Sequence, residues 1–298
     1  MKYIFTSDWH IRTDKPVCRT DDFMETQKKV VGFIYDLAEK EDATVIIGGD
    51  IFHKARPERA QEIEMFLLKM FRRAPTAFIG GNHDFLYHRA ENAYKGSIGV
   101  LALAGFKNVW YYEYGKHASI DMFSFGKEVL GLEHYKLSCR HKIAVIHKYC
   151  DNKPIPDFIG DGIQARDLLK EMPYDIIVTG DNHHGFTYKE EDRTVINPGS
   201  ITRQVANMKE YKPRVYVYDE DEGIIRTVYL PDTDLDAVDD THLERIKERV
   251  GRIDKFVDQL VHSQDIDIDF DTNLKVYIDT NKVNKSVRNT IQDIIEGI

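Results

Sequence analysis

Short apolar runs alternate with helically spaced apolar positions through the first third of the chain. Strands are predicted where the runs are continuous, at 2–7, 43–49 and 76–81. Helices are predicted where apolar residues recur every three or four positions, at 22–40, 57–73 and 93–105. Strands that alternate with helices pair in parallel, because each helix carries the chain back across the sheet. The pattern therefore predicts an α/β fold.

Beyond residue 106 the short apolar runs follow one another without helical spacing between them. Antiparallel strands are predicted at 108–114, 119–126 and 128–135, and further strands at 142–147, 175–180 and 194–200. A hairpin is predicted at 210–231, with its turn at Asp219–Gly223. The acidic stretch 231–240 is a candidate linker, followed by a predicted helix (240–262), strand (274–279) and helix (283–296). We therefore place a large domain at 1–231 and a small α+β domain at 232–298.

Composition narrows the class of protein. With 42% apolar and 31% charged residues the chain is an ordinary globular protein, and no apolar run approaches the length of a membrane span. The start, MKYIFTS, is too quickly polar for a signal peptide, and three cysteines without paired spacing favour a reducing cytoplasm. Of the net charge of −9, residues 232–298 carry 16 acids against nine bases, so the larger domain is nearly neutral. Such a balance disfavours a protein that coats nucleic acid.

Five apolar runs end in residues that commonly bind metals. These are Asp8 with His10, Asp50, Asn82 with His83, His147, and Asp181 with His183. Taken singly, each fragment would be read as a cap, a turn or a core histidine. Ligand sites in open α/β sheets form beyond the carboxyl ends of the strands, so five such ends can converge on one site.

Strand alternation indicates which side chains share a side. Residues two apart project the same way, which pairs Asp8 with His10 and Asp181 with His183. His184 is then the least favoured ligand. Carboxylates, imidazoles and one amide suit Mn, Mg, Fe or Zn and exclude a soft thiolate site. Two adjacent metals need a bridging carboxylate, and Asp50, which follows two glycines, is the expected bridge.

The ordered segments SDWH, GGDIFH, GGNHD, VIHK and GDNHH resemble the five motifs of the calcineurin-like metallophosphoesterases. GDIFHKARP followed by GGNHD resembles, more narrowly, the SbcD-type DNA repair nucleases and their phage counterparts. The resemblance covers residues 1–205. It implies a two-layer β sandwich flanked by helices, followed by the small C-terminal domain.

The resemblance also implies a role for each motif residue. One metal would be held by Asp8, His10, Asp50 and His183, and the other by Asp50, Asn82, His147 and Asp181. His83 would protonate the leaving oxygen, His53 would be a second active-site histidine, and Asp84 would orient His83. Arg203, in NPGSITR, is a candidate contact to a substrate phosphate, with a structural ion pair as the alternative.

One position departs from the family pattern. The family usually has Gly-His-x-His at the last motif, where this chain has Asp181 in place of the first histidine. A hard carboxylate there favours Mn, with Mg as the alternative, over Zn. Asp181 could instead lie outside the ligand shell, with His184 completing the second metal.

The first functional hypothesis is a Mn-dependent DNA nuclease with two metals, working with an SbcC-type coiled-coil ATPase in a recombination and repair complex. The resemblance implies a homodimer, which we expect to form through the helices at 57–73 and 85–104. The C-terminal domain (232–298) would cap the site or contact a partner, with a passive stabilising role as the alternative. A phosphodiesterase or phosphatase acting on nucleotides or small phosphoesters is the alternative. A scaffold that uses metals only to bind is a third, disfavoured because the ligand set is complete.

Overall fold

The computed structural model describes residues 1–127, 140–156, 159–241, 278, 283–284 and 287. The chain divides into two compact units, Met1–Asp240 and Thr241–Ile298. The predicted strand at 128–135 and nearly all of the predicted C-terminal domain lie outside the described residues. Among the helices of the described part, none combines the length and apolar character needed to cross a membrane.

The first unit is built around two six-stranded mixed sheets, which confirms the predicted fold. The first sheet has the order β14-β13-β1-β2-β3-β4, and the strands from β1 to β4 run parallel. Its strands are β1 (Lys2–Thr6), β2 (Ala43–Ile47), β3 (Thr76–Phe78), β4 (Val109–Tyr111), β13 (Arg214–Asp219) and β14 (Ile224–Tyr229). The last two form the predicted hairpin, and β13 pairs antiparallel with β1.

The second sheet has the order β11-β12-β10-β7-β6-β5. Its four inner strands run parallel, with an antiparallel strand at each edge. Its strands are β5 (Tyr114–His117), β6 (Ile120–Phe123), β7 (Ile143–Ile146), β10 (Ile176–Val178), β11 (Phe186–Glu190) and β12 (Arg193–Asn197). A small separate pair joins β8 (Cys150–Asp151) to β9 (Ile163–Gln164).

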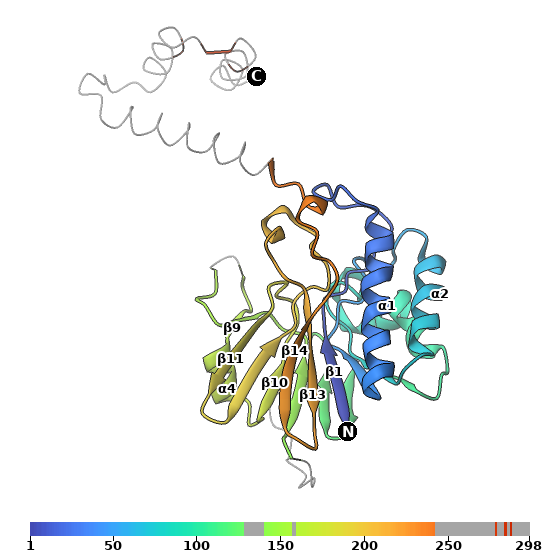
Figure 1. Cartoon of the computed structure of the whole chain (residues 1–298), viewed down its shortest axis with the longest axis vertical. Helices are drawn as coiled ribbons and strands as arrows, with labels where there is room; N and C mark the ends of the chain where they lie inside the picture. Colours follow the sequence, from blue (N-terminus) through green and yellow to red (C-terminus); the bar gives the residue numbers. More distant parts are fainter. Residues whose placement is uncertain (128–139, 157–158, 242–277, 279–282, 285–286, 288–298) are drawn as a thin grey trace, which may run out of the picture. The chain divides into compact units, whose positions relative to one another are not determined.

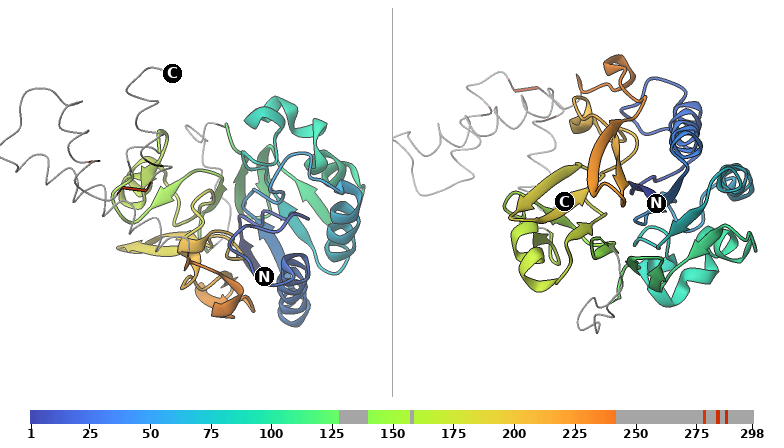
Figure 2. Two further views of the ribbon diagram at one scale, coloured as in Figure 1. Left: turned by 90° about the horizontal axis from the view of Figure 1, so that it is seen from above. Right: turned by 60° about the horizontal axis from the view of Figure 1, so that its bottom comes forward.

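Helices cover the outer faces of both sheets. The blue and teal helices α1 and α2 lie on one side of the first unit, and α4 lies on the other (Figures 1 and 2). The α-helices are α1 (Phe23–Glu41), α2 (Ala60–Phe71), α3 (Ser97–Leu103) and α4 (Ala165–Glu171), and the 3₁₀ turns are η1 (Leu86–His88), η2 (Ala90–Lys95), η3 (Ala206–Met208) and η4 (Leu235–Ala237). Asp22 caps α1 by accepting a hydrogen bond from the Glu25 N–H at 3.2 Å.

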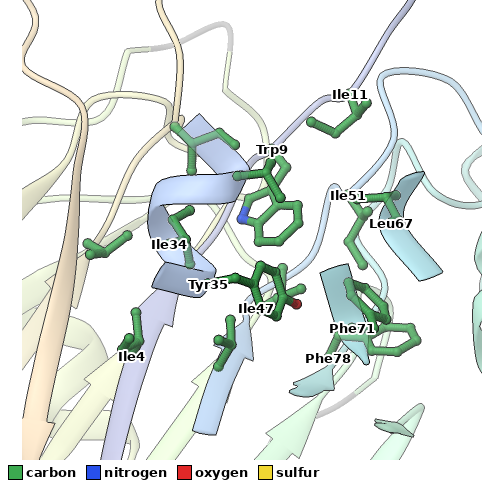
Figure 3. Packing of buried hydrophobic residues seen from close by; sticks show 14 of the residues in the cluster. Ile4, Trp9, Ile11, Ile34, Tyr35, Ile47, Ile51, Leu67, Phe71 and Phe78 are labelled. Atoms are coloured by element: carbon green, nitrogen blue, oxygen red, sulfur yellow. The ribbon is translucent and has the colours of Figure 1, made fainter. Parts of the chain in front are cut away.

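Strand alternation divides the apolar residues between two interior layers. In β1, Ile4 faces the helices, where it packs in the core that includes Tyr35, Phe71 and Phe78 (Figure 3). Its neighbours Tyr3 and Phe5 face the second sheet. Because both faces of these parallel strands are covered, their sequences are continuously apolar. A third cluster packs α4 on the outer face of the second sheet.

Two local predictions were wrong. The strand at 109–111 is parallel to β3, whereas antiparallel pairing was predicted, and the strand at 120–123 is antiparallel to β5 but parallel to β7. For β4 the reason is that the short segment of η1, η2 and α3 acts as a crossover between β3 and β4. The helix predicted at 93–105 is broken at Gly96, because the extended backbone there lies against the Ala55 carbonyl and has no room for a Cβ atom.

The first unit extends beyond the predicted boundary at 231. Asp232 is buried and accepts hydrogen bonds from the guanidinium groups of Arg19 (3.0 Å) and Arg203 (2.9 Å). Further along, the Thr20 hydroxyl donates to the Asp236 carbonyl at 2.7 Å. The segment predicted as a linker is therefore packed on the first unit as far as Asp240.

Candidate metal centre

The predicted ligands converge at the carboxyl ends of five parallel strands. Asp8 and His10 follow β1, Asp50 follows β2, and Asn82 and His83 follow β3 in the first sheet; His147 follows β7, and Asp181 and His183 follow β10 in the second. The ligand atoms of Asp8, His10 and His183 lie within 4.8 Å of one another, and so do those of Asp8, Asp50 and His147. Residues spread over most of the first unit therefore form one cluster.

The ligand pairs come together through turns. Asp8, His10, Asp50 and Asp181 have φ values of 51°, 45°, 51° and 70°, in the left-handed region that L-residues seldom adopt. Asp8 and His10 do lie in one group, together with His183, but their left-handed φ values show that extended alternation is not the cause. Asp181 lies with His147. Strained residues of this kind collect at functional sites because the surrounding structure holds them there.

Asp50 occupies the centre of the cluster. Its Oδ2 lies 3.4 Å from Nε2 of His10 and 3.4 Å from Nε2 of His147. The other carboxylate oxygen accepts a hydrogen bond from the His83 N–H at 2.9 Å, which fixes its orientation. One oxygen placed equally between two imidazoles is suited to bridge two cations.

The ring orientation of His147 is fixed by the backbone. Its Nδ1–H donates to the Gly48 carbonyl at 2.7 Å, so Nε2 faces the cluster. Although burial opposes it, the negative charge of Asp50 raises the pKa of His147 to about 10. Positive charge is therefore favoured at Nε2, and a metal cation bound there would displace the proton.

The orientation of the Asn82 amide also favours a cation beside His147. Its Oδ1 lies 3.1 Å from Nε2 of His147 and faces the Asp50 carboxylate. Turned over, the amide would donate to Asp50, which is the favoured orientation without a cation. The oxygen-inward orientation is the one in which Asn82 can bind a cation together with Asp50 and His147.

On the other side of Asp50, two further nitrogens face each other. Nε2 of His10 lies 2.9 Å from Nε2 of His183, and the buried Oδ2 of Asp8 has no hydrogen-bond partner among the described residues. Burial is the main cause that lowers the pKa of both imidazoles, so both are neutral near pH 7 and their lone pairs are available. Oxygen and imidazole donors of this kind fit divalent cations such as Mn²⁺.

The side chains of the last motif, GDNHH, point in different directions, as expected. Asp181 lies with Oδ1 4.0 Å from Nε2 of His147, and its N–H donates to Asp8 at 3.0 Å. The Asn182 amide points to the Cys150 carbonyl, at 2.9 Å. His184 is exposed, and its ring packs against Tyr211 with centroids 5.7 Å apart. Asp181, and not His184, thus lies at the second half of the cluster.

His83 and His53 lie at the edge of the cluster. The His83 ring lies 4.8 Å from that of His10, and its Nδ1–H donates to the His53 carbonyl at 2.9 Å. Nε2 of His83 is left as the nitrogen that can carry a proton. Burial, together with the charge of Arg12, lowers the pKa of His53 to about 4, which keeps that ring neutral near pH 7.

Asp84 does not make the expected contact with the His83 ring. Its buried carboxylate accepts hydrogen bonds from the N–H groups of Gly81 (2.9 Å), Ile51 (3.2 Å) and Phe52 (2.9 Å). The expectation needs correction because the His53 carbonyl occupies the position at Nδ1 of His83. Asp84 joins the turns after β2 and β3, and thereby positions the backbone that carries Asp50 and His83.

Arg203 is the one predicted site residue that the structure places away from the cluster. Its side chain is buried and bonded to Asp232 and to the carbonyls of Lys209 and Asp234. These bonds match the structural ion pair that was its alternative reading, and they leave the guanidinium directed into the protein. A substrate phosphate cannot reach a fully buried group.

Sequence reasoning missed the groove beside His83. It has a volume of about 400 Å³, and its lining includes Lys54, Arg56, Tyr87 and His88. Lys54 and Arg56 lie within GDIFHKARP, but no motif predicts the groove, because tertiary contacts bring the segments 53–56 and 83–88 together, including the bond from His83 to the His53 carbonyl. A second cavity, of about 580 Å³, lies beside His147 and Asp181, and its lining combines apolar residues such as Phe123, Phe125 and Met172 with charged ones such as Lys148 and Asp161.

Glycines allow the backbone to approach the cluster closely. Gly49 has φ 98°, and a Cβ there would meet the His147 ring. We expect Gly49→Ala to destabilise the protein by about 1–3 kcal/mol, because alanine is strained at this φ and its Cβ would clash with the His147 ring. The same clash should weaken metal binding. Thermal unfolding with and without Mn²⁺ measures both effects.

Gly32 is the matched control, because a Cβ at this position in α1 meets nothing within 4 Å. Gly32→Ala should stabilise the protein by about 0.5–1 kcal/mol through the helix preference of alanine. Equal effects of the two substitutions would contradict the geometry around His147.

Metal binding should depend on pH. Burial, together with the charge of Asp50, raises the pKa of Asp8 to about 7, so this carboxyl must lose protons when a cation binds. Affinity for Mn²⁺ should fall by roughly tenfold per pH unit for each proton released, below the pKa of about 7 for Asp8 and below the pKa of about 10 for His147. Calorimetric titration in buffers of different ionisation enthalpy counts these protons, and Asp8→Asn should reduce the count; a pH-independent affinity between pH 5.5 and 8 would exclude the linkage.

Comparison with known proteins places this cluster in a family. Similar solved structures include an archaeal phosphodiesterase (16% identity, 77% of this chain and 100% of that chain, TM-score 0.41) and TT1561 of Thermus thermophilus (12%, 76% and 98%, 0.46). A putative 5′-nucleotidase from Staphylococcus aureus is also similar (13%, 77% and 53%, 0.45). Among curated proteins none matches the sequence significantly. The family model for calcineurin-like phosphoesterases matches residues 1–218, and the chain therefore belongs to this family.

Proposed function

We propose that this protein is a Mn²⁺-dependent DNA nuclease that hydrolyses phosphodiester bonds at a two-metal site, as the nuclease subunit of an SbcCD-like complex. The observation that carries the proposal is the position of Asp50 Oδ2, 3.4 Å from the imidazoles of both His10 and His147, with His83 beside it. The likeness of GDIFHKARP and GGNHD to the nuclease branch supports the narrower assignment.

The ligands divide into two sets around Asp50. Asp8, His10 and His183 would hold one cation with it, and Asn82, His147 and Asp181 the other. Divalent cations at such a centre polarise a phosphoryl oxygen and lower the pKa of water. Asp181 is the most exposed of these carboxylates, and its hard oxygen favours Mn²⁺, or Mg²⁺, over Zn²⁺.

His83 then has the role of general acid. Its Nδ1–H is held by the His53 carbonyl, which directs the opposite nitrogen toward a leaving oxygen. As the phosphorus–oxygen bond to the leaving group breaks, a proton held on Nε2 passes to that oxygen. His53, beside it, would help to hold the substrate phosphate.

The proposal is tested with end-labelled single- and double-stranded DNA incubated with Mn²⁺, Mg²⁺ or Zn²⁺. Cleavage that requires a divalent cation and is strongest with Mn²⁺ is expected. Hydrolysis of bis-p-nitrophenyl phosphate in the same preparation reports on the centre itself. Active hydrolysis of that diester without cleavage of any DNA would reject the nuclease assignment.

A phosphodiesterase acting on nucleotides or small phosphoesters is the second candidate. The cavity of about 580 Å³ beside Asp181 favours it, because its size and its aromatic residues suit a small organic ligand. A panel of cyclic and linear nucleotides tests this reading. A turnover of one of these that exceeds the turnover of DNA would favour it.

The partners proposed are DNA, an SbcC-type ATPase and a second copy of this chain. α2 and α3 pack together, and Met65, Val100 and Leu103 on them are 51%, 45% and 74% exposed. Exposed apolar side chains on adjacent helices favour an interface. We expect a dimer by light scattering at micromolar concentration and a monomer for Leu103→Glu; a wild-type monomer would exclude this surface. The buried free thiols of Cys18 and Cys150 suit the proposed cytoplasmic location.

A further inference from the structure

The groove beside His83 has the charge that a polyanion requires. His53, Lys54, Arg56, His83, Tyr87 and His88 are among its lining residues, and none of its described lining residues is acidic. Lys54 and Arg56 are exposed and form no ion pair within the described part of the chain. The cavity beside His147 and Asp181 differs, because its lining carries three carboxylates (Asp161, Glu171 and Asp181) against two lysines (Lys127 and Lys148). A chain of phosphates is therefore favoured on the His83 side.

Tyr87, at this groove, has an unfavourable backbone conformation and an exposed side chain. Its side chain is 77% exposed, and its backbone has φ 60° and ψ 25°. His88 follows with φ 54°, and its Nδ1–H donates to the carbonyl of Asn82 at 2.9 Å. Consecutive left-handed residues other than glycine are strained, and an exposed ring gains little from burial. The turn that displays Tyr87 is thus tied to a residue of the metal centre.

We propose that the groove binds the nucleotide on the leaving-group side of the scissile phosphate, with its unpaired base stacked on Tyr87 and the next phosphate bound by Lys54 and Arg56. This assignment rests on the proposed nuclease function. The choice of the leaving-group side follows from the position of the groove, because the groove begins at His83 and the leaving oxygen must lie there. Every base has a face that can stack, so the contact selects unpaired strands without selecting sequence.

Three variants separate the stacking contact from backbone strain. Tyr87→Gly removes the ring and relieves the left-handed conformation, Tyr87→Phe keeps the ring, and Tyr229→Ala removes a similarly exposed tyrosine, on β14. We expect Tyr87→Gly to lower kcat/KM for single-stranded DNA by roughly 5- to 100-fold, the effect of one lost base–aromatic stack. It should also raise the melting temperature by about 2–4 °C.

The same variants are compared on duplex DNA and on bis-p-nitrophenyl phosphate. Tyr87→Gly should narrow the difference in kcat/KM between single-stranded and duplex DNA. It should lower the rate on the small diester much less than the rate on DNA. Tyr87→Phe and Tyr229→Ala should remain close to the wild type on DNA. If Tyr87→Gly cleaves single-stranded DNA at the wild-type rate, or loses activity equally on DNA and the small diester, the stacking role is wrong. If the wild type hydrolyses the diester but no DNA, the nuclease function itself fails.

Discussion

Asp50→Asn should reduce turnover of any phosphodiester by at least about a thousandfold, because loss of an outer partner of a metal ligand already costs roughly 10–100-fold. The substitution removes the charge that lies between His10 and His147 and converts one bridging oxygen into an amide group. Mn²⁺ bound per chain should fall below two. Metal analysis after dialysis and a diester assay measure the two effects.

The control is Asp36→Asn, which changes an exposed carboxylate on α1 that pairs with Arg73. It should leave both turnover and metal content unchanged. If the Asp50→Asn protein folds, binds two Mn²⁺ ions and keeps its activity, Asp50 does not bridge the metals.

His83→Ala should leave metal content unchanged and lower turnover of DNA by roughly 10²–10⁴-fold, the usual contribution of a general acid. The loss should depend on the leaving group. p-Nitrophenolate departs without protonation, whereas a sugar oxygen needs a proton, so the variant should be impaired much less on bis-p-nitrophenyl phosphate than on DNA. Steady-state rates on both substrates decide this.

His184→Ala is the matched control, because that ring packs on Tyr211 outside the cluster. It should retain wild-type activity on both substrates. Equal losses on the two substrates for His83→Ala would indicate that His83 acts on the metals or on binding, and not as a proton donor.

Much of the first unit is predictable from sequence, because its parallel strands are apolar on both faces and its ligands follow strand ends directly. That rule predicted that Asp8, Asp50 and His147 could converge, and they do, although His147 follows a strand of the other sheet. The prediction failed where the decisive partner was distant. β4 is short enough to suit either pairing direction, and its direction is set by the crossover through α3.

The same limit applies within the site. The family resemblance implied that Asp84 orients His83, yet its carboxylate binds backbone N–H groups on two separate turns. The left-handed residues Asp8 and His10 are likewise held by hydrogen bonds to a distant segment, at the carbonyls of Gly49 (3.1 Å) and Asp50 (2.9 Å). Residue type and spacing identify which groups can do chemistry, whereas tertiary contacts determine how they are held.

The shared carboxylate of Asp232 decides where the first unit can be separated from the rest of the chain. Arg19 and Arg203 are both buried and both bind it. A polypeptide ended at residue 231 would retain the whole metal cluster but leave the buried guanidinium group of Arg203 without its carboxylate partner, at a cost of about 3–5 kcal/mol. Arg19 would lose the same partner and keep its pair with Asp21. An independently folding catalytic fragment must therefore include residues 232–240, although none of them belongs to a strand or to the metal centre.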